Sequence, residues 1–185
     1  MSDAPGAADL RYVQPAARSR ERGLPAVGFR LVVPPGVELL DPPAETDVLV
    51  TAVERAGGAG AVQGELVITA FTAPLSIDGP AILRSLAESA AASLLDPPGR
   101  AHLGPGAEID LAGRRAWRID AEIERDHAGE APPCPHASLV AMGHARPATG
   151  VGLLILLLAR DRPWPSGERM LSSLDVLAPD EPATT

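Results

Sequence analysis

Lysine is absent from this chain, and cysteine and aromatic residues are scarce. The scarcity of cysteine and of aromatic rings excludes some structures and functions. The 185 residues include one cysteine, Cys134, so the chain contains no internal disulfide bond. All 16 basic residues are arginine, and the accompanying abundance of Ala, Gly and Pro indicates GC-rich coding, so we infer no function from the arginines. Two Trp, one Tyr and two Phe residues are too few to build a platform on which nucleotide bases stack.

The chain also lacks a hydrophobic run long enough for a transmembrane helix. Its main apolar run, Val151–Ala159, is far shorter than the roughly 20 residues that a helical span needs. Residues 1–25 contain no apolar signal-peptide segment and no lipidation cysteine, so we expect a cytoplasmic protein of bacterial type. The formal net charge of -8 repels phosphate backbones and anionic lipids, which disfavours nucleic acid as a partner.

The length and the 45% hydrophobic content fit one globular domain. We expect this domain at residues 26–178, between a flexible N-terminal arm (residues 1–25, rich in Pro, Ala, Gly and charge) and a C-terminal tail (residues 179–185). Both alternating residue sets of Val151–Ala159 are apolar. A helix remains an alternative for so short a run, but the breakers on either side favour a central strand covered on both faces, with Ile155 fully buried.

The remaining pattern predicts an antiparallel sheet and two helices. Further strands are expected at residues 27–33, 46–53, 65–71, 108–111, 115–124 and 137–145, with a hairpin loop at residues 57–60 and a loop containing Gly104, Pro105 and Gly106. A long amphipathic helix is expected at residues 80–95, and a short one begins near Pro163. The fold class is therefore α+β: an α/β/α sandwich in which the long helix and the C-terminal helix pack on a central antiparallel sheet.

Residues 115–124 carry the clearest alternation in the chain. Trp117 and Ile119 fall on one face, whereas the opposite face holds Arg118, Asp120, Glu122 and Glu124. We interpret these four residues as an exposed surface and a candidate partner-binding face. Successive carboxylates on a strand lie about 6.6 Å apart, a spacing that also suits paired-carboxylate hydrolysis, but no apolar neighbour on that face would raise one pKa above the others.

Other reactive side chains form no recognisable catalytic or metal motif. His127, Cys134, His136 and His144 lack the spacing of zinc ligands, so we expect no metal and no cofactor. Cys134 lies between prolines without a helix N-terminus to lower its pKa, so we expect no thiol nucleophile. These residues predict no catalytic activity.

Three segments resemble the PsbP-like superfamily: the strand ending in Pro-Gly at residues 28–36, the glycine turn at residues 111–117, and the helix closing on Ser-Leu at residues 168–174. The superfamily includes photosystem extrinsic subunits, a Ran-binding nuclear import factor, and DcrB-type and LpqN-type bacterial proteins. The resemblance implies an α/β/α sandwich about an antiparallel sheet. It also implies a role as an adaptor or chaperone, since characterised relatives mostly act in this way.

Together these observations favour a non-enzymatic protein-binding module, adaptor or chaperone-like, with another protein as its partner. A lipid or small-ligand carrier is the first alternative, because a leucine-rich sandwich could open an apolar pocket beneath the long helix. A small hydrolase that uses the surface carboxylates is the second.

Overall fold

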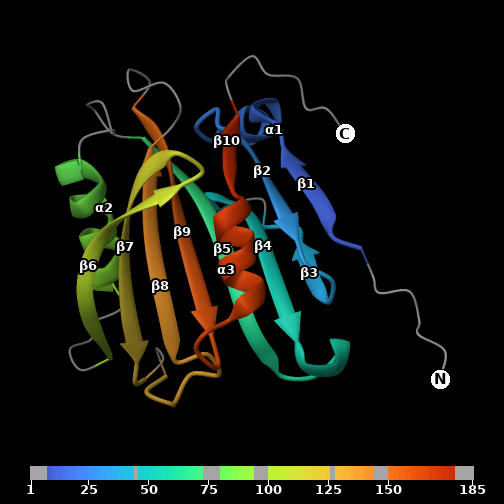
Figure 1. Ribbon diagram of the computed structural model, residues 1–185, viewed down its shortest axis with the longest axis vertical. Coiled ribbons are helices and arrows are strands. Elements are labelled where there is room, and N and C mark those ends of the chain that lie inside the picture. The colour runs from blue at the N-terminus through green and yellow to red at the C-terminus, as the bar shows by residue number, and fades with distance from the viewer. Residues whose placement is uncertain are drawn as a thin grey trace.

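The computed structural model describes residues 8–43, 46–72, 80–93, 100–125, 128–143 and 150–177. Two antiparallel sheets dominate it (Figure 1). The larger sheet has seven strands in the order β3-β4-β5-β9-β8-β7-β6: β3 (Val37–Leu40), β4 (Val48–Arg55), β5 (Val62–Thr72), β6 (Ala101–Leu111), β7 (Arg114–Ile123), β8 (His136–Gly143) and β9 (Val151–Ala159). The smaller sheet has the order β1-β2-β10: β1 (Leu10–Gln14), β2 (Gly28–Val33) and β10 (Asp175–Leu177).

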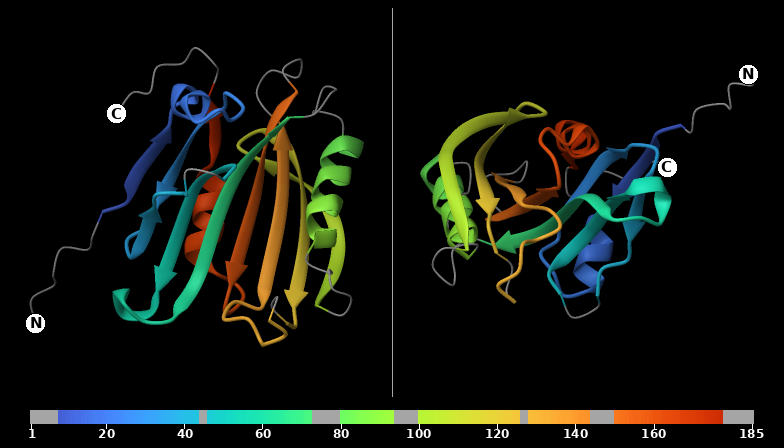
Figure 2. Two further views of the ribbon diagram at one scale, coloured as in Figure 1. Left: turned by 180° about the vertical axis from the view of Figure 1, so that it is seen from behind. Right: turned by 90° about the horizontal axis from the view of Figure 1, so that it is seen from below.

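Helices pack on both faces of the large sheet. These are α2 (Pro80–Ala92) and α3 (Pro165–Ser173), whereas α1 (Ala16–Glu21) lies against β2 of the small sheet, and a 3-10 turn, η1, is found at Ala56–Gly58. Helix α2 lies against β7 and β8 on one face, whereas α3 lies on the other face beside β2 (Figure 2). This arrangement confirms the predicted α+β class and the packing of both helices on the sheet. None of the described helices is long and apolar enough to cross a membrane.

Strand β9 is the middle strand of the seven, as predicted. Ile155 has no exposed surface and pairs with Ile68 of β5 and Val140 of β8. Its face joins the main hydrophobic core, which is shared by β2, β4, β5, β9, α3 and β10. On the opposite face Leu154 and Leu156 pack against a second cluster that contains Leu83 and Ala87 of α2. The apolar run is therefore covered from both sides.

The hairpin between β6 and β7 turns at Ala112 and Gly113, as the sequence predicts. Both residues have positive φ, 52° and 77°, the backbone that the tightest hairpin turns require. The backbone N–H of Gly113 donates to Oδ1 of Asp110 at 2.9 Å. Glycine adopts this conformation without strain, whereas Ala112 adopts it because the turn forces it.

The N-terminal segment differs from the expected flexible arm. Residues 10–14 form β1 and pair along the length of β2, and residues 16–21 form α1. The side chain of Arg22 then donates to three main-chain carbonyls, those of Val48, Pro43 and Thr46, at 2.7 to 3.1 Å. These contacts join residues more than 20 positions apart in sequence, so the composition of residues 1–25 does not predict them.

The start of β6 also differs from the prediction. Gly104 and Pro105 were expected in a loop, but β6 runs through them from Ala101. The register with β7 shifts between Leu103 and Gly106, which accommodates the residues that break the regular pairing. Beneath this irregular stretch Gly106 approaches the indole of Trp117 so closely that a Cβ would overlap the ring. The glycine that suggested a loop is needed for packing instead.

Trp164 fixes the beginning of α3 against the sheet. Its ring lies between Gly64 of β5 and Gly167 of α3, and a Cβ on either glycine would overlap it. Its Nε1 donates to Oε2 of Glu54 at 2.5 Å. The buried tryptophan thus holds α3 in place through shape and one hydrogen bond.

The fold predicts a large cost for truncating Ile155. We expect Ile155→Ala to lower the free energy of unfolding by about 2–5 kcal/mol, because the packed strand leaves a cavity where the side chain was. Urea unfolding measures this change. Leu10→Ala is the control: Leu10 is 56% exposed and should change stability by no more than about 0.5 kcal/mol. Equal effects of the two substitutions would place Ile155 outside the core.

Gly167→Ala tests the contact with Trp164. In an exposed helix, alanine is favoured over glycine by about 1 kcal/mol. At Gly167 we expect the opposite sign, a loss of about 1–3 kcal/mol, because the new methyl group displaces the ring. Thermal unfolding measures it, with Ser172→Ala at an exposed position of the same helix as the control. A stabilised Gly167→Ala variant would contradict the packing described here.

Candidate functional site

Strand β7 presents two chemically different faces, as its alternation predicts. Ile119 packs on the α2 side, in the cluster that includes Leu83. Arg118 and Asp120 lie on the opposite side, under α3. The face predicted to be exposed is therefore partly covered by the C-terminal helix.

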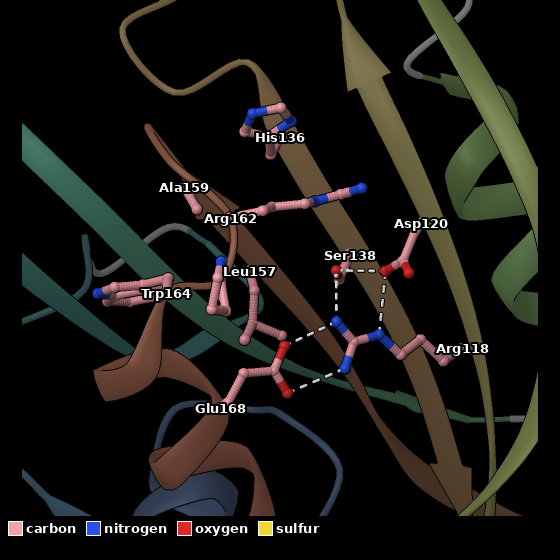
Figure 3. A pocket seen from close by; sticks show the side chains of 10 residues that line it. Arg118, Asp120, His136, Ser138, Leu157, Ala159, Arg162, Trp164 and Glu168 are labelled. Atoms are coloured by element: carbon pink, nitrogen blue, oxygen red, sulfur yellow. Dashed lines mark hydrogen bonds and ion pairs between the residues drawn. The ribbon is translucent and has the colours of Figure 1, made fainter.

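Arg118 is the centre of a polar network on this face (Figure 3). Its Nη1 and Nη2 donate to the two carboxylate oxygens of Glu168 in α3, at 3.0 and 2.7 Å. Its Nε donates to Oδ1 of Asp120 at 3.0 Å, and Nη2 also donates to Oγ of Ser138 at 2.9 Å. Ser138 in turn donates to Oδ1 of Asp120 at 2.5 Å. One guanidinium thus links β7, β8 and α3.

The prediction that Arg118 is an exposed surface residue is wrong. Its side chain is 24% exposed, because α3 covers it and Glu168 forms a bidentate ion pair with it. Nothing near Arg118 in sequence indicates this partner, which lies 50 positions away. Of the predicted face, the side chains of Glu122 and Glu124 are the more exposed, at 66% and 55%.

The network keeps Asp120 ionised. Burial alone would raise the pKa of this carboxyl, but hydrogen bonds from Ser138 and Arg118 and the positive charges of Arg118 and Arg162 outweigh burial and hold the pKa below its usual range. Since a catalytic acid needs a raised pKa, Asp120 is poorly suited to that role.

Two adjoining pockets open on this face, and we call them the α3 pocket and the β6 pocket. The α3 pocket, about 280 Å³, is lined by Arg118, Asp120, His136, Ser138, Leu157, Ala159, Arg162, Pro163, Trp164 and Glu168 (Figure 3). The β6 pocket, about 250 Å³, is lined by His102, Leu103, Gly104, Asp120, Ala121, Glu122 and Arg162. Asp120 and Arg162 line both, so the two pockets adjoin, and we call the surface that they cover, from α3 to β6, the groove.

Arg162 lies across this groove. Its Nη2 donates to the main-chain carbonyls of Ala121 in β7 and Ala137 in β8, at 3.0 and 2.6 Å. In the sequence Arg162 is one of the charged residues that follow the apolar run Val151–Ala159, and nothing nearby indicates these partners. Its contacts become visible once the segment after β9 folds back over the sheet.

The groove brings together Ser138, His136 and Asp120, the residue types of a hydrolytic triad. Their hydrogen bonds differ from those of a triad. A triad needs the serine hydroxyl bonded to the histidine and the histidine to the acid. Here Ser138 donates directly to Asp120, and Nδ1 of His136 has no hydrogen-bond partner among the described residues. The arrangement therefore lacks the proton path of a serine hydrolase.

The other candidate residues remain apart. Cys134 is buried, and burial together with the charge of Glu65 raises the pKa of its thiol, which disfavours a nucleophilic thiolate. Within the described part of the chain no group of three or more His, Cys, Asp or Glu side chains is arranged to hold a metal ion. His127 and His144 lie outside the described residues.

In fold the chain is similar to two solved structures. The solution structure of cyanobacterial PsbP (CyanoP) from Synechocystis sp. PCC 6803 matches with a TM-score of 0.58 and 14% identity, over 96% of this chain and 99% of that one. The crystal structure of LpqN, involved in cell envelope biogenesis of Mycobacterium tuberculosis, matches with a TM-score of 0.55 and 14% identity, over 81% of this chain and 83% of that one. No protein-family model and no curated protein matches the sequence. The chain thus has a PsbP-like fold, which confirms the resemblance at the level of architecture.

The ion pair between Arg118 and Glu168 predicts a stability difference between two arginines of one strand. We expect Arg118→Ala to cost about 1–3 kcal/mol, because Asp120, Ser138 and Glu168 all lose a donor. Arg115→Ala is the matched control, since Arg115 is exposed and its Nε lies 3.7 Å from Oε1 of Glu108 in a surface ion pair; the substitution should change stability by no more than about 0.5 kcal/mol. Chemical unfolding of both variants measures the difference, and similar costs would contradict a bridging role for Arg118.

Proposed function

We propose that the protein is a non-enzymatic protein-binding module, an adaptor or chaperone-like protein, and that a segment of its partner binds in the groove between α3 and β6. The observation that carries this proposal is that two pockets adjoin on one face of the sheet and share Asp120 and Arg162. Adjoining pockets along neighbouring strands fit successive side chains of an extended polypeptide better than a compact metabolite.

The chemistry of the groove supports a polypeptide. Leu157 and Trp164 provide apolar surface in one pocket, and Leu103, 37% exposed, provides it in the other. Polar and charged side chains line both pockets as well. A polypeptide offers both main-chain hydrogen-bonding groups and apolar side chains, so it can match such a mixed lining.

The carrier alternative has less support. A carrier would need an apolar cavity beneath α2, but Leu83, Ala87 and Ala91 of that helix pack directly against Ile119 and Leu139 of the sheet. The groove on the other face contains ionic groups that a lipid chain would leave without partners.

The hydrolase alternative is weakened by the same network that shapes the groove. Asp120 is committed to Arg118 and Ser138, and its pKa is lowered rather than raised. Of the other two carboxylates, Glu122 lines the β6 pocket and is 66% exposed, whereas Glu124 is 55% exposed and lines neither pocket. The lowered pKa keeps Asp120 deprotonated, so it is a poor proton donor for general acid catalysis.

Site-specific photocrosslinking tests the proposal. A photoreactive residue replaces Glu122 in the groove, and, as the matched control, Glu38 on the exposed face of β3 at the far edge of the sheet. In cells that naturally make the protein, we expect one defined protein partner to crosslink from position 122 and not from position 38. Both substitutions remove one exposed carboxylate, so they should change stability equally little.

Three outcomes would overturn the proposal. Crosslinking of the same protein from both positions would place the interface outside the groove. Recovery of lipid alone with the purified protein, by mass spectrometry of an organic extract, would favour the carrier. Turnover of ester or glycoside substrates that is lost in Asp120→Asn would favour the hydrolase.

A further inference from the structure

We propose that the sheet face beside α2 binds an amphipathic helix of a partner protein, with the apolar stripe of that helix on β9 and β5 and a basic residue beside Glu65. This surface lies on the side of the sheet opposite the groove, so the inference goes beyond the proposed function and does not depend on it. Three features carry it: a row of partly exposed apolar side chains, a width that matches one helix, and a partly buried carboxylate at one end.

Strands β9 and β5 alternate between buried and partly exposed side chains. Those that face the main core, such as Ile155 and Ile68, have no exposed surface. The two strands are directly paired, with Leu156 opposite Val67, so their partly exposed side chains form one contiguous surface, which we call the open face. It consists of Leu154, Leu156 and Leu158 of β9 and of Glu65, Val67, Thr69 and Phe71 of β5.

Helix α2 covers the neighbouring strands of the same sheet face. It lies against β7 and β8, where Ile119 and Leu139 beneath it are each 3% exposed. Leu154 and Leu156 of β9 pack against the same cluster but keep part of their surface exposed. Figure 2 (left) shows α2 at one side of the sheet, with no described helix in front of β9 and β5. The change in burial from β8 to β9 therefore marks where the cover by α2 ends.

The flank of α2 that borders the open face is apolar as well. Leu86 and Ala90, both partly buried, belong to the same cluster as Leu154. Arg84 lies on the other flank, 5.7 Å from the centroid of the Trp117 ring, because positions 84 and 86 are about 200° apart around a helix. An apolar side chain that binds at this border therefore contacts both α2 and the sheet.

The width of the open face fits one α-helix. Neighbouring strands lie about 4.8 Å apart, so β9 and β5 together occupy a width of about 10 Å, close to the diameter of a helix with its side chains. Helix α2 itself lies against two strands, β7 and β8. It also stands about one helix diameter above the sheet, which keeps a flat bilayer away from β9 and β5. A second helix beside α2 would extend the same layer over these strands.

The outward face of α2 argues against a second copy of this chain as the occupant. In a symmetric dimer through the open face, α2 of one copy would meet the open face of the other. The outward residues of α2 are polar and exposed, and two of them, Arg84 and Glu88, pair with each other. Such a face offers leucine side chains little apolar contact. Two copies that each carry a net charge of -8 also repel each other.

Glu65 supplies the charge that an incoming helix has to match. It pairs with Leu158 at one end of the open face. Burial raises the pKa of its carboxyl, although the charge of Arg55 acts in the opposite direction. No ion pair to Glu65 is found within the described part of the chain. A lysine or arginine near one end of a bound helix would complement this carboxylate, which favours a basic amphipathic helix over a neutral apolar one.

NMR titration of the full-length protein, labelled in its Ile, Leu and Val methyl groups, tests the proposal. The probe is a designed peptide of about 14 residues of alanine, glutamine and leucine, with leucines at spacings of three and four and a lysine at each end. We expect saturable shifts of the methyl groups of Val67, Leu154 and Leu156. A peptide of the same composition with its leucines spread around the helix should bind at least about tenfold more weakly, because it has no apolar stripe.

A pair of matched variants tests the apolar part of the surface. Val67→Thr keeps a branched side chain but replaces a methyl group by a hydroxyl on the open face, and should weaken peptide binding about threefold or more, followed at Leu156. Val13→Thr makes the same change at a partly exposed position of β1, and should leave affinity within about twofold. The comparison of the two leucine arrangements on the wild type holds even if a variant folds poorly.

A second pair tests the charge. Glu65→Gln should weaken binding of the lysine peptide about threefold or more, and should leave unchanged the binding of a peptide with glutamine in place of both lysines. Glu21→Gln removes an exposed carboxylate of α1 outside the open face, so it controls for net charge and should leave both affinities within about twofold.

Several results would overturn the proposal. Equal binding of the two leucine arrangements, shifts confined to residues outside the open face, or wild-type affinity in Val67→Thr would each contradict it. A dimer in sedimentation that Val67→Thr weakens would assign the open face to a second copy. Laurate that shifts the same methyl groups at lower concentration than the peptide would assign it to an acyl chain. Crosslinking at position 122 concerns the opposite face, so its success or failure is independent of these results.

Discussion

The apolar strand β9 imposes the constraint on which the other layers depend. Leucine and isoleucine side chains point to both faces of this strand, so each face needs a cover that excludes water. Helix α2 and its cluster provide it on one side, and the main core with α3 and the small sheet provides it on the other. The architecture follows from having to bury a two-sided strand at the centre of an antiparallel sheet.

This constraint also explains why the groove lies where it does. Helix α3 lies on the core side of the sheet, but it is short, and Trp164 fixes its beginning against β5, so it covers Arg118 of β7 and leaves Glu122 of the same strand exposed. The polar face of β7 therefore extends beyond the helix. At the edge of this cover, Arg118 of β7 forms an ion pair with Glu168 of α3. What remains between α3 and β6 is a groove with a polar lining and a rigid base.

Periodic segments were predictable from the sequence, and long-range pairs were not. The run at Val151–Ala159, the alternation of β7 and the stripe of α2 each repeat often enough to define their environment, and all three predictions are confirmed. Strands β3 and β10 are too short to show a pattern, and β1 depends on pairing with β2. The sequence places the candidate face on the correct side of β7, but the burial of Arg118 depends on its partner Glu168. The contacts of Ser138 and Arg162 form only when strands distant in sequence come together in the folded chain.

The irregular start of β6 bears on how readily a strand of another molecule can add to this edge of the sheet. β6 ends the large sheet, and a regular edge strand offers unpaired N–H and C=O groups on which a strand of another molecule can add. Pro105 has no N–H group, and the register shift between Leu103 and Gly106 bends the ladder at the same place. Growth of intermolecular β-structure is therefore interrupted along this edge, so the side of the sheet that borders the groove resists fibrillar aggregation while its side chains stay accessible.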